Sequence, residues 1–158
     1  MILSGQSIRA RGIFTPFSER TREFGLTHGV GPAGYDVRID QDIFMWPGRF
    51  SLASTMEHFD MPTDLLGIVH DKSTWARMGI ACQNTVIEPG WKGYLTLELT
   101  NHGPEPVELK KGMPIAQIIF HVLDQHSSVA YDGKYQNQKR GAQPAIFEPV
   151  ASFSPTSG

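Results

Sequence analysis

Short runs of alternating or uniformly apolar residues, separated by turn residues, recur along the 158-residue chain. The clearest alternation spans residues 93–100, where Leu95, Leu97 and Leu99 fall on one side of an extended chain and polar residues on the other. Further runs with strand character cover residues 35–39, 43–46, 50–56, 65–69, 106–109 and 115–122. Many short strands with turn residues between them predict an all-β sandwich or barrel.

Two short segments break the strand pattern and are predicted as helices. One covers residues 4–11, with Ser4 as its N-cap and Gly12 as its stop. The other covers residues 71–79, where a serine and threonine cap precedes helix-tolerant residues and a glycine ends them. Residues 14–34 are rich in Gly, Thr, Ser, Arg and Pro without a sustained period, so they are predicted as a long surface loop.

Length and composition fit one compact domain. A chain of 158 residues with 40% hydrophobic and 19% charged residues suits a single core, which we place in residues 1–140. The 16 glycines and 11 prolines agree with many turns. Residues 141–158 are rich in Pro and Ser with scattered aromatic residues, so we expect them to form a partly flexible C-terminal arm.

Charge and cysteine content exclude several classes of partner and site. A formal charge of −2 gives no general attraction to nucleic acid or to an anionic membrane, so neither partner is expected. The single cysteine, Cys82, excludes an intramolecular disulfide framework and cysteine-rich metal clusters. No apolar run approaches the roughly 18 residues of a membrane helix, and the first residues lack a signal-peptide pattern, so we expect a cytoplasmic protein.

Cations and a hydroxyl gather at the predicted helix of residues 71–79. Lys72 and Ser73 lie at its start, and Arg77 follows Ser73 by four residues, which places both on one helix face. Together with the helix N-terminus, this set could grip a phosphate. Alternatively, Ser73 is only an N-cap and Arg77 is a solvated surface cation.

Two carboxylates and an indole lie in or just before the strand at residues 93–100. Glu98 is on the polar side of that strand, and if this side lines a pocket, burial raises the carboxyl pKa and suits it to exchange protons with water. Glu88 and Trp91 flank a Pro-Gly turn and could hold a sugar and a base. The alternatives are a solvated Glu98 on an outer sheet face and a Trp91 that belongs to the core.

The stretch 131–140 combines two tyrosines with the basic residues Lys134, Lys139 and Arg140, which could close over phosphates or form a solvated loop. Several familiar chemistries are absent. The six histidines show no spacing typical of zinc hydrolases or zinc deaminases. The chain also has no Walker A loop, no Gly-x-Gly-x-x-Gly and no Gly-x-Ser-x-Gly. Cys82 has no identifiable histidine partner and is expected to be a buried small hydrophobe.

Five segments, taken in order, resemble the dCTP deaminase branch of the dUTPase-like superfamily. They are Gly34-Tyr-Asp-Val-Arg38, Lys72-Ser-Thr-Trp-Ala-Arg-Met-Gly-Ile80, Ile87-Glu-Pro-Gly-Trp-Lys-Gly-Tyr-Leu-Thr-Leu-Glu-Leu-Thr-Asn101, Gly112-Met-Pro-Ile-Ala-Gln117 and Lys134-Tyr-Gln-Asn-Gln138. The resemblance implies a distorted jelly-roll, or β-clip, dUTPase-like fold with one or two short helices. It also implies a homotrimer with active sites between subunits and a C-terminal arm that closes over bound nucleotide.

The same resemblance implies roles for individual residues. Glu98 matches the catalytic glutamate, which activates water for attack on cytosine C4 without zinc. Glu88 stands where the family contacts the deoxyribose 3′-hydroxyl, and Trp91 where an aromatic residue packs on the sugar. Magnesium is bound through the triphosphate, and no protein residue is implied as a metal ligand. The implied substrate-binding residues are Lys72, Ser73, Thr74, Arg77, Asn84, Thr85, Glu88, Trp91, Tyr131, Lys134 and Gln138.

The resemblance implies deamination of dCTP by water to dUTP and ammonia, in the supply of pyrimidine deoxynucleotides. Plain dUTPases of the superfamily cleave the α–β phosphate link with an aspartate at the place of Glu88 and lack a glutamate at the place of Glu98, so Glu98 favours deamination. The alternatives are a dUTP diphosphatase, a bifunctional enzyme that yields dUMP, and a non-catalytic nucleotide-binding trimer. The sequence also leaves open dCMP or a modified cytosine nucleotide as the substrate.

Overall fold

The computed structural model describes residues 1–149, which form twelve strands and two short helices. The elements follow one another as α1 (Gly5–Arg11), β1 (Phe14–Thr15), β2 (Thr21–Glu23), β3 (Leu26–Val30), β4 (Tyr35–Arg38), β5 (Ile43–Met45), β6 (Phe50–Asp60), β7 (Leu65–Asp71), α2 (Ser73–Ala76), β8 (Ile80–Cys82), β9 (Val86–Ile87), β10 (Lys92–Asn101), β11 (Val107–Leu109) and β12 (Pro114–Val122). Neither helix of this part of the chain is long and apolar enough to cross a membrane. The structure is mostly β, as the sequence predicts.

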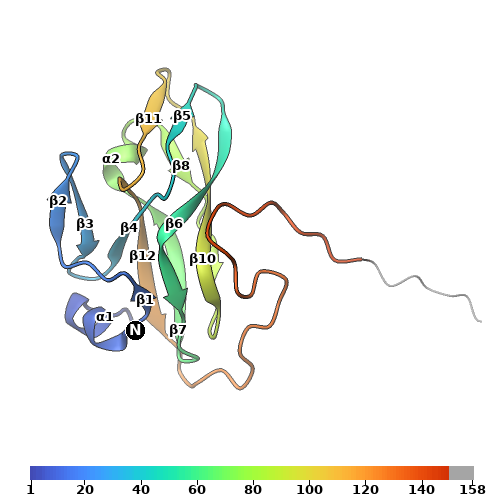
Figure 1. The fold of residues 1–158 in the computed structure, drawn as a ribbon. Coiled ribbons are helices and arrows are strands. Elements are labelled where there is room, and N and C mark those ends of the chain that lie inside the picture. The colour runs from blue at the N-terminus through green and yellow to red at the C-terminus, as the bar shows by residue number, and fades with distance from the viewer. Residues whose placement is uncertain (150–158) are drawn as a thin grey trace, which may run out of the picture.

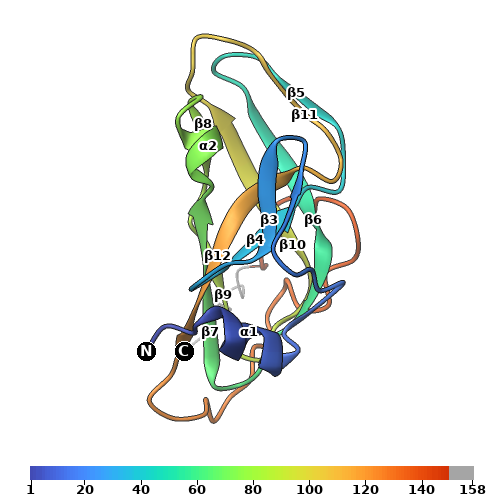
Figure 2. The same ribbon diagram turned by 90° about the vertical axis from the view of Figure 1, so that its left-hand side faces the viewer.

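Ten of these strands form two larger sheets, and the other two form a small ribbon. One sheet has the order β1-β6-β10-β8 and the other β2-β3-β4-β12-β7-β9, while β11 pairs with β5. All these strand pairs are antiparallel. Figures 1 and 2 show β6 and β10 side by side through the body, with α1 near one end and the β5–β11 ribbon at the other.

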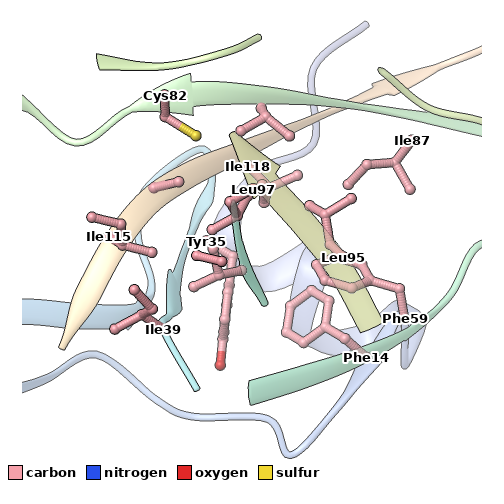
Figure 3. Packing of buried hydrophobic residues seen from close by; sticks show 14 of the residues in the cluster. Phe14, Tyr35, Ile39, Phe59, Cys82, Ile87, Leu95, Leu97, Ile115 and Ile118 are labelled. Carbon is pink, nitrogen blue, oxygen red and sulfur yellow. The ribbon is translucent and has the colours of Figure 1, made fainter. Parts of the chain in front are cut away.

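The core joins side chains from both larger sheets. Leu97 of β10, Tyr35 of β4 and Ile118 of β12 have 0% exposure and gather in one region (Figure 3). Phe14 of β1 packs on Tyr35 across the sheets, with their ring centroids 4.1 Å apart. Burial of side chains this large contributes about 1.5–3 kcal/mol each. This packing holds β10 with its leucines inward, so the polar side that carries Glu98 faces away from the core.

All seven strands predicted from the hydrophobic pattern are confirmed, and six of them agree within two residues at each end. The exception is β6, which extends to Asp60. Its later buried positions include the polar residues Thr55 and Glu57 before Phe59, so the apolar alternation is interrupted there. Glu57 is fully buried there, and its carboxylate accepts hydrogen bonds from the Arg38 backbone amide at 3.0 Å and from Arg38 Nε at 2.9 Å. At this position the strand is stabilised by the buried ion pair between Glu57 and Arg38, so it lacks the apolar residue from which a strand is predicted.

The helices are confirmed in position but not in every detail. α1 has Ser4 as its N-cap and ends at Gly12, which has a φ of 61° as a left-handed stop requires. α2 is shorter than predicted, and its N-cap is Lys72, so the interpretation of Ser73 as an N-cap is wrong. Trp75 holds this turn through burial and a 2.6 Å hydrogen bond from its Nε1 to the Pro114 carbonyl, in place of a side-chain cap.

The prediction of one long loop over residues 14–34 is wrong, because this segment contains β1, β2 and β3. All three residues of β2 are exposed, so no apolar alternation marks it; backbone pairing with β3 makes it a strand. Gly29 of β3 is essential to the close packing here. A Cβ at this position would lie 2.4 Å from the Glu19 carbonyl oxygen, and the φ of 84° favours glycine.

Candidate active site

A cavity of about 560 Å³ lies beside the paired strands β6 and β10. Its walls come from β6, from β9 and the turn after it, from β10, and from segment 131–145. In Figure 1 this segment, coloured orange to red, runs along the β10 side of the body. Six of the predicted site residues line the cavity: Thr85, Glu88, Trp91, Glu98, Tyr131 and Gln138.

Glu98 lies on the cavity side of β10, opposite Leu52 of β6. Its backbone carbonyl accepts a 3.0 Å hydrogen bond from the Gln83 amide, which holds the turn after β8 next to it. Its carboxylate oxygen Oε2 is buried, and no group within residues 1–149 donates to it. Burial raises the pKa of the Glu98 carboxyl, because the charged form loses hydration. The cavity therefore contains a half-buried carboxyl with an unused acceptor.

The turn before β10 presents Glu88 and Trp91 to the same cavity. The Trp91 amide donates to the Glu88 carbonyl at 3.1 Å, and Gly90 between them has a φ of 81°. The Trp91 indole is only 5% exposed, and its Nε1 donates to the Tyr135 carbonyl at 2.6 Å. Its ring centroid lies 6.2 Å from that of Phe59. Trp91 is thus both a core residue and a wall of the cavity.

The chain after β12 returns to this turn and is held there by hydrogen bonds. Gln136 Nε2 donates to the carbonyl oxygens of Tyr131 at 2.6 Å and of Gly90 at 3.0 Å. Gln138 forms an isolated bridge to Gly93 of β10. These contacts make residues 131–138 a wall of the cavity instead of a solvated loop.

An ion pair and a hydrogen bond then direct the chain across the cavity. Arg140 donates two hydrogen bonds of 2.6 Å to the Asp40 carboxylate. The Arg140 guanidinium holds the pKa of Asp40 below its usual range. The Gln143 amide donates to Thr96 Oγ1 at 3.1 Å, and residues 143–145 line the cavity. The first part of the predicted arm therefore covers the cavity of its own chain.

A second cavity, of about 330 Å³, has more polar walls and shares no lining residue with the first. It contains the predicted residues Lys72 and Ser73 at the start of α2, together with Gln117 of β12. Lys72 Nζ donates to Asp36 Oδ2 at 2.7 Å, and both side chains are largely buried. The charge of Lys72 is therefore already balanced inside the cavity.

His28 also lines the second cavity, and neither of its ring nitrogens has a hydrogen-bond partner in the part of the chain that the structure describes. Its Nε2 lies 3.4 Å from a Glu23 carboxylate oxygen. Burial, followed by repulsion from the Arg38 charge, lowers the pKa of His28. The neutral ring offers one donor and one acceptor to an occupant of this cavity.

The structure does not bring all predicted site residues together. Thr74, Arg77, Asn84 and Lys134 are exposed and line neither of the two cavities. Lys134 Nζ instead lies over the Tyr135 ring, 5.3 Å from its centroid. The predicted residues are thus divided between two cavities and an exposed set within one chain. Residues 150–158 of the predicted arm lie outside the described residues.

Sequence reasoning missed Leu52 and Gln143 of the first cavity and Gln117 of the second. Leu52 sits in an ordinary strand alternation, so its pattern does not separate a cavity-facing leucine from any other. Gln143 lies in a segment without periodicity. Gln117 is a polar residue inside the apolar strand β12, and this interruption was the one available signal.

Across residues 1–149, no group of three or more His, Cys, Asp or Glu side chains lies close enough together to hold a metal ion. Cys82 is buried, as expected, and burial raises its pKa to about 12. Its thiol therefore stays protonated near neutral pH, which makes it a poor nucleophile.

Comparison with known structures identifies the fold. The dCTP deaminase of Agrobacterium tumefaciens superposes with a TM-score of 0.62 at 20% identity, over 77% of this chain and 48% of that one. The native EIAV dUTPase superposes with a TM-score of 0.58 at 23% identity, over 77% of this chain and 97% of that one. These similarities confirm the dUTPase-like fold.

Comparison of sequences identifies the family. A dCTP deaminase-like family model matches residues 36–123. The dCTP deaminase of Campylobacter hominis is 34% identical over 176 residues, which cover 90% of this chain and 92% of the relative. The dCTP deaminase of Anaplasma marginale is 36% identical over 168 residues, which cover 85% of this chain and 91% of the relative. Because the likeness extends over most of both sequences, this chain belongs to the dCTP deaminase-like family.

Proposed function

We propose that this enzyme hydrolyses the exocyclic amine of dCTP to give dUTP and ammonia. The observation that carries the proposal is Glu98, whose buried Oε2 lies at a cavity without a donor from residues 1–149. The relatives from Campylobacter hominis and Anaplasma marginale are both named as dCTP deaminases, which supports the same reaction.

Hydrolytic deamination needs a group that takes a proton and returns it. The oxygen of water forms a bond to C4 while ring N3 gains a proton, and the C4–N4 bond then breaks as ammonia leaves. The Glu98 carboxylate accepts the proton of the attacking water and delivers protons to N3 and then to the amine. Burial brings its pKa closer to neutral pH, where one carboxyl can act in both directions.

The remaining walls of the first cavity are proposed to hold the nucleoside. The Trp91 indole packs on the deoxyribose, and the exposed Glu88 carboxylate accepts a hydrogen bond from the 3′-hydroxyl. The turn at Asn84 and Thr85 is proposed to pair with the polar edge of the base. The Thr85 amide already donates to the Gln83 carbonyl at 3.0 Å, so other groups of the turn would make these contacts. This turn lies next to Glu98, because the Gln83 amide binds the Glu98 carbonyl.

The triphosphate contacts are proposed to come from a neighbouring subunit. Lys72 and Ser73 lie in a cavity that shares no residue with the one that contains Glu98, so a single chain divides the predicted set. A homotrimer with active sites between subunits would bring the second cavity of one chain to the first cavity of the next. Thr74 of α2 and Arg77 at its C-cap are exposed and available to such a neighbour.

Magnesium is proposed to enter with the nucleotide, bound mainly through the phosphate oxygens. The second cavity contains the carboxylates of Asp36 and Asp71. Both oxygens of Asp36 already accept hydrogen bonds, from Lys72 Nζ at 2.7 Å and from Gln117 Nε2 at 3.3 Å, so the ion would be held through the phosphates and at most through Asp71. When bound, it supplies positive charge that offsets the triphosphate. Proton transfer is assigned to Glu98, and the proposed reaction uses no zinc.

A second candidate is hydrolysis of the phosphate chain, alone or after deamination. It is favoured by Glu88, because this second carboxylate lies in the same cavity as Glu98 and could position a water. Incubation of the purified protein with dCTP, and separately with dUTP, in the presence of Mg²⁺ tests both candidates. The products to resolve are dUTP, dUMP, pyrophosphate and ammonia.

A deaminase converts dCTP to equal amounts of dUTP and ammonia and leaves added dUTP intact. Release of dUMP and pyrophosphate from dUTP alone indicates a diphosphatase, and their release together with ammonia from dCTP indicates a bifunctional enzyme. Nucleotide binding without any product indicates a non-catalytic binding protein and contradicts the proposal.

A further inference from the structure

Glu98 has chemically different neighbours on its two sides. Its strand, β10, lies between β8 and β6 in the four-stranded sheet. On the β8 side, the Gln83 amide donates to the Glu98 carbonyl at 3.0 Å, so the backbone of the turn at residues 83–85 lies there. On the β6 side, the residue directly opposite Glu98 is Leu52. The carboxyl therefore has the polar turn at residues 83–85, of which Thr85 lines the cavity, on one side and an aliphatic side chain on the other.

The apolar surface continues from Leu52 along β6. Phe50 is two residues away on the same face, and both line the cavity. Thr100, opposite Phe50, is polar but does not line the cavity. On the other side of the Leu52–Glu98 pair, the next pair on this face is Ser54–Thr96. The backbone amide of Gly141 donates to Ser54 Oγ at 3.3 Å, and that of Gln143 donates to Thr96 Oγ1 at 3.1 Å. Within the cavity lining, the wall therefore passes from Thr96, past Glu98, to Leu52 and Phe50.

A cytosine ring with C4 at Glu98 has one orientation that satisfies its polar edge. N3 and C5 lie on opposite sides of C4, and N3 and O2 require hydrogen-bond partners whereas C5 and C6 do not. With N3 toward the turn at residues 83–85, C5 faces Leu52 and Phe50. The reverse orientation would place N3 and O2 against aliphatic and aromatic carbon, leaving polar groups unpaired.

From this arrangement we infer that the enzyme also deaminates cytosine nucleotides with an apolar substituent at C5, of which 5-methyl-dCTP is the simplest. Leu52 is the specificity-determining residue that contacts the substituent. The inference rests on the proposed function, since it takes Glu98 to be the group that acts at C4. The methyl group is accommodated because the wall that it meets is aliphatic and the cavity measures about 560 Å³.

The reaction balances in the same way as with dCTP. The oxygen of water bonds to C4, the C4–N4 bond breaks, and the nitrogen leaves as ammonia with protons relayed through Glu98. 5-Methyl-dCTP and water thus give dTTP and ammonia. No oxidant, reductant or further co-reactant is needed, and the bond between C5 and its methyl group is untouched.

The test compares kcat/KM for dCTP and 5-methyl-dCTP with purified wild-type protein and a Leu52→Asn variant, each with Mg²⁺. We expect the wild-type values to agree within about tenfold, and the ratio of 5-methyl-dCTP to dCTP to fall about tenfold in Leu52→Asn. One apolar group in a pocket is typically worth a factor of this size. The ratio is measured on a single preparation, so partial unfolding of the variant cancels.

Leu66→Asn is the matched control. Leu66 is a half-buried leucine of β7 that lines neither cavity, so its replacement should leave the substrate ratio unchanged. If dCTP is deaminated and 5-methyl-dCTP is more than about 100-fold worse, the inference is wrong and the proposed function stands. An unchanged ratio in Leu52→Asn overturns the assignment of Leu52. If neither nucleotide releases ammonia, the proposed function itself fails.

Discussion

The two carboxyls of the first cavity, Glu98 and Glu88, differ in burial and therefore in the chemistry that each can perform. Glu98 lies in the middle of β10, where its Oε2 is enclosed and its pKa is raised. Glu88 lies in the turn before the strand and is exposed. A carboxyl whose charged form is disfavoured by burial is better suited to proton transfer than one in open solvent. This difference in burial supports the proposed roles, proton transfer for Glu98 and hydrogen bonding to substrate for Glu88.

The raised pKa of Glu98 predicts where activity is lost on acidification. Only the ionised carboxylate can accept a proton from water, so kcat/KM for dCTP falls as the pH drops through the raised pKa of Glu98. Because burial disfavours the charge, this fall begins above the range of an exposed glutamate, whose pKa is about 4.3. Ammonia release measured from about pH 4 to 8 checks the prediction. An acid limb centred on the ordinary glutamate value would contradict it.

The raised pKa of Glu98 also makes folding stability depend on pH. The dependence is opposite to that of a salt-bridged acid, whose pKa is lowered. The folded protein disfavours the ionised form of Glu98. The resulting cost to folding stability is therefore absent below the pKa that Glu98 has in the unfolded chain. It grows as the pH rises toward the raised folded pKa. The residue is therefore retained at the expense of stability near neutral pH, as is common for groups in active sites.

The arm is an element without a helix or strand of its own, and its position depends on a few contacts to other elements. Arg140 binds Asp40 through two hydrogen bonds of 2.6 Å, and Lys111 lies 3.1 Å from the same carboxylate. Further along, the Ile146 amide donates to the Tyr135 hydroxyl at 3.1 Å. The ion pair between Arg140 and Asp40 lies directly before the arm, so it sets the path of the residues that cover the cavity.

Asp40→Asn is expected to loosen the arm. Loss of the charge that binds Arg140 should raise KM for dCTP several-fold, with a smaller effect on kcat, and should speed tryptic cleavage after Arg140. Since the pKa of Asp40 is lowered, the wild-type ion pair persists as the pH falls through the ordinary carboxyl range and is lost only below it. Steady-state kinetics and timed proteolysis measure both effects.

The control for Asp40→Asn is Glu19→Gln. It breaks the Arg9–Glu19 ion pair, which has the same two hydrogen bonds of 2.6 Å but involves α1, far from the arm along the chain. This variant should keep the wild-type KM and cleavage rate. If Asp40→Asn behaves like Glu19→Gln, the ion pair does not hold the arm in place.

The elements predicted correctly are those whose burial follows a simple period. β10 is the best example, because Leu97 and Leu99 are fully buried while Glu98 between them and Thr100 after them are only partly buried. β2 could not be predicted, because it is exposed on both faces and exists only through its pairing with β3. Hydrophobic periodicity reports burial, so strands stabilised mainly by backbone hydrogen bonds escape it.

The candidate site was predictable as a set of residues but not as an arrangement. The residue types near Glu98 and near Ser73 each suggest a chemistry from the sequence. Their division between two cavities depends on how the sheets pack, and on which side of β10 each strand lies. Local patterns do not contain this information. The covering of the first cavity by residues 143–145 likewise arises from long-range contacts of the arm.

At the level of the whole molecule, the separation of the two cavities makes a prediction about assembly. Glu98→Gln and a Ser73→Ala/Arg77→Ala double variant should each be inactive alone. Suppose that every active site takes Glu98 from one subunit and Ser73 and Arg77 from another. In trimers that mix the two variants at random, about half of the sites receive an intact Glu98 and about half receive an intact Ser73 and Arg77, so about a quarter receive both and are active. Co-expression of the two variants followed by an assay of ammonia release measures this. No activity above that of the separate variants would place each active site within a single chain.

The role of Glu98 is tested most directly by the rate of ammonia release from saturating dCTP with wild-type protein and Glu98→Gln. We predict that kcat falls about 10²–10⁴-fold, because the amide cannot relay protons, while dCTP binding measured by calorimetry stays close to wild type. Glu88→Gln, which alters the exposed carboxyl in the same cavity, should lose much less. A Glu98→Gln enzyme that releases ammonia at the wild-type rate would contradict the account.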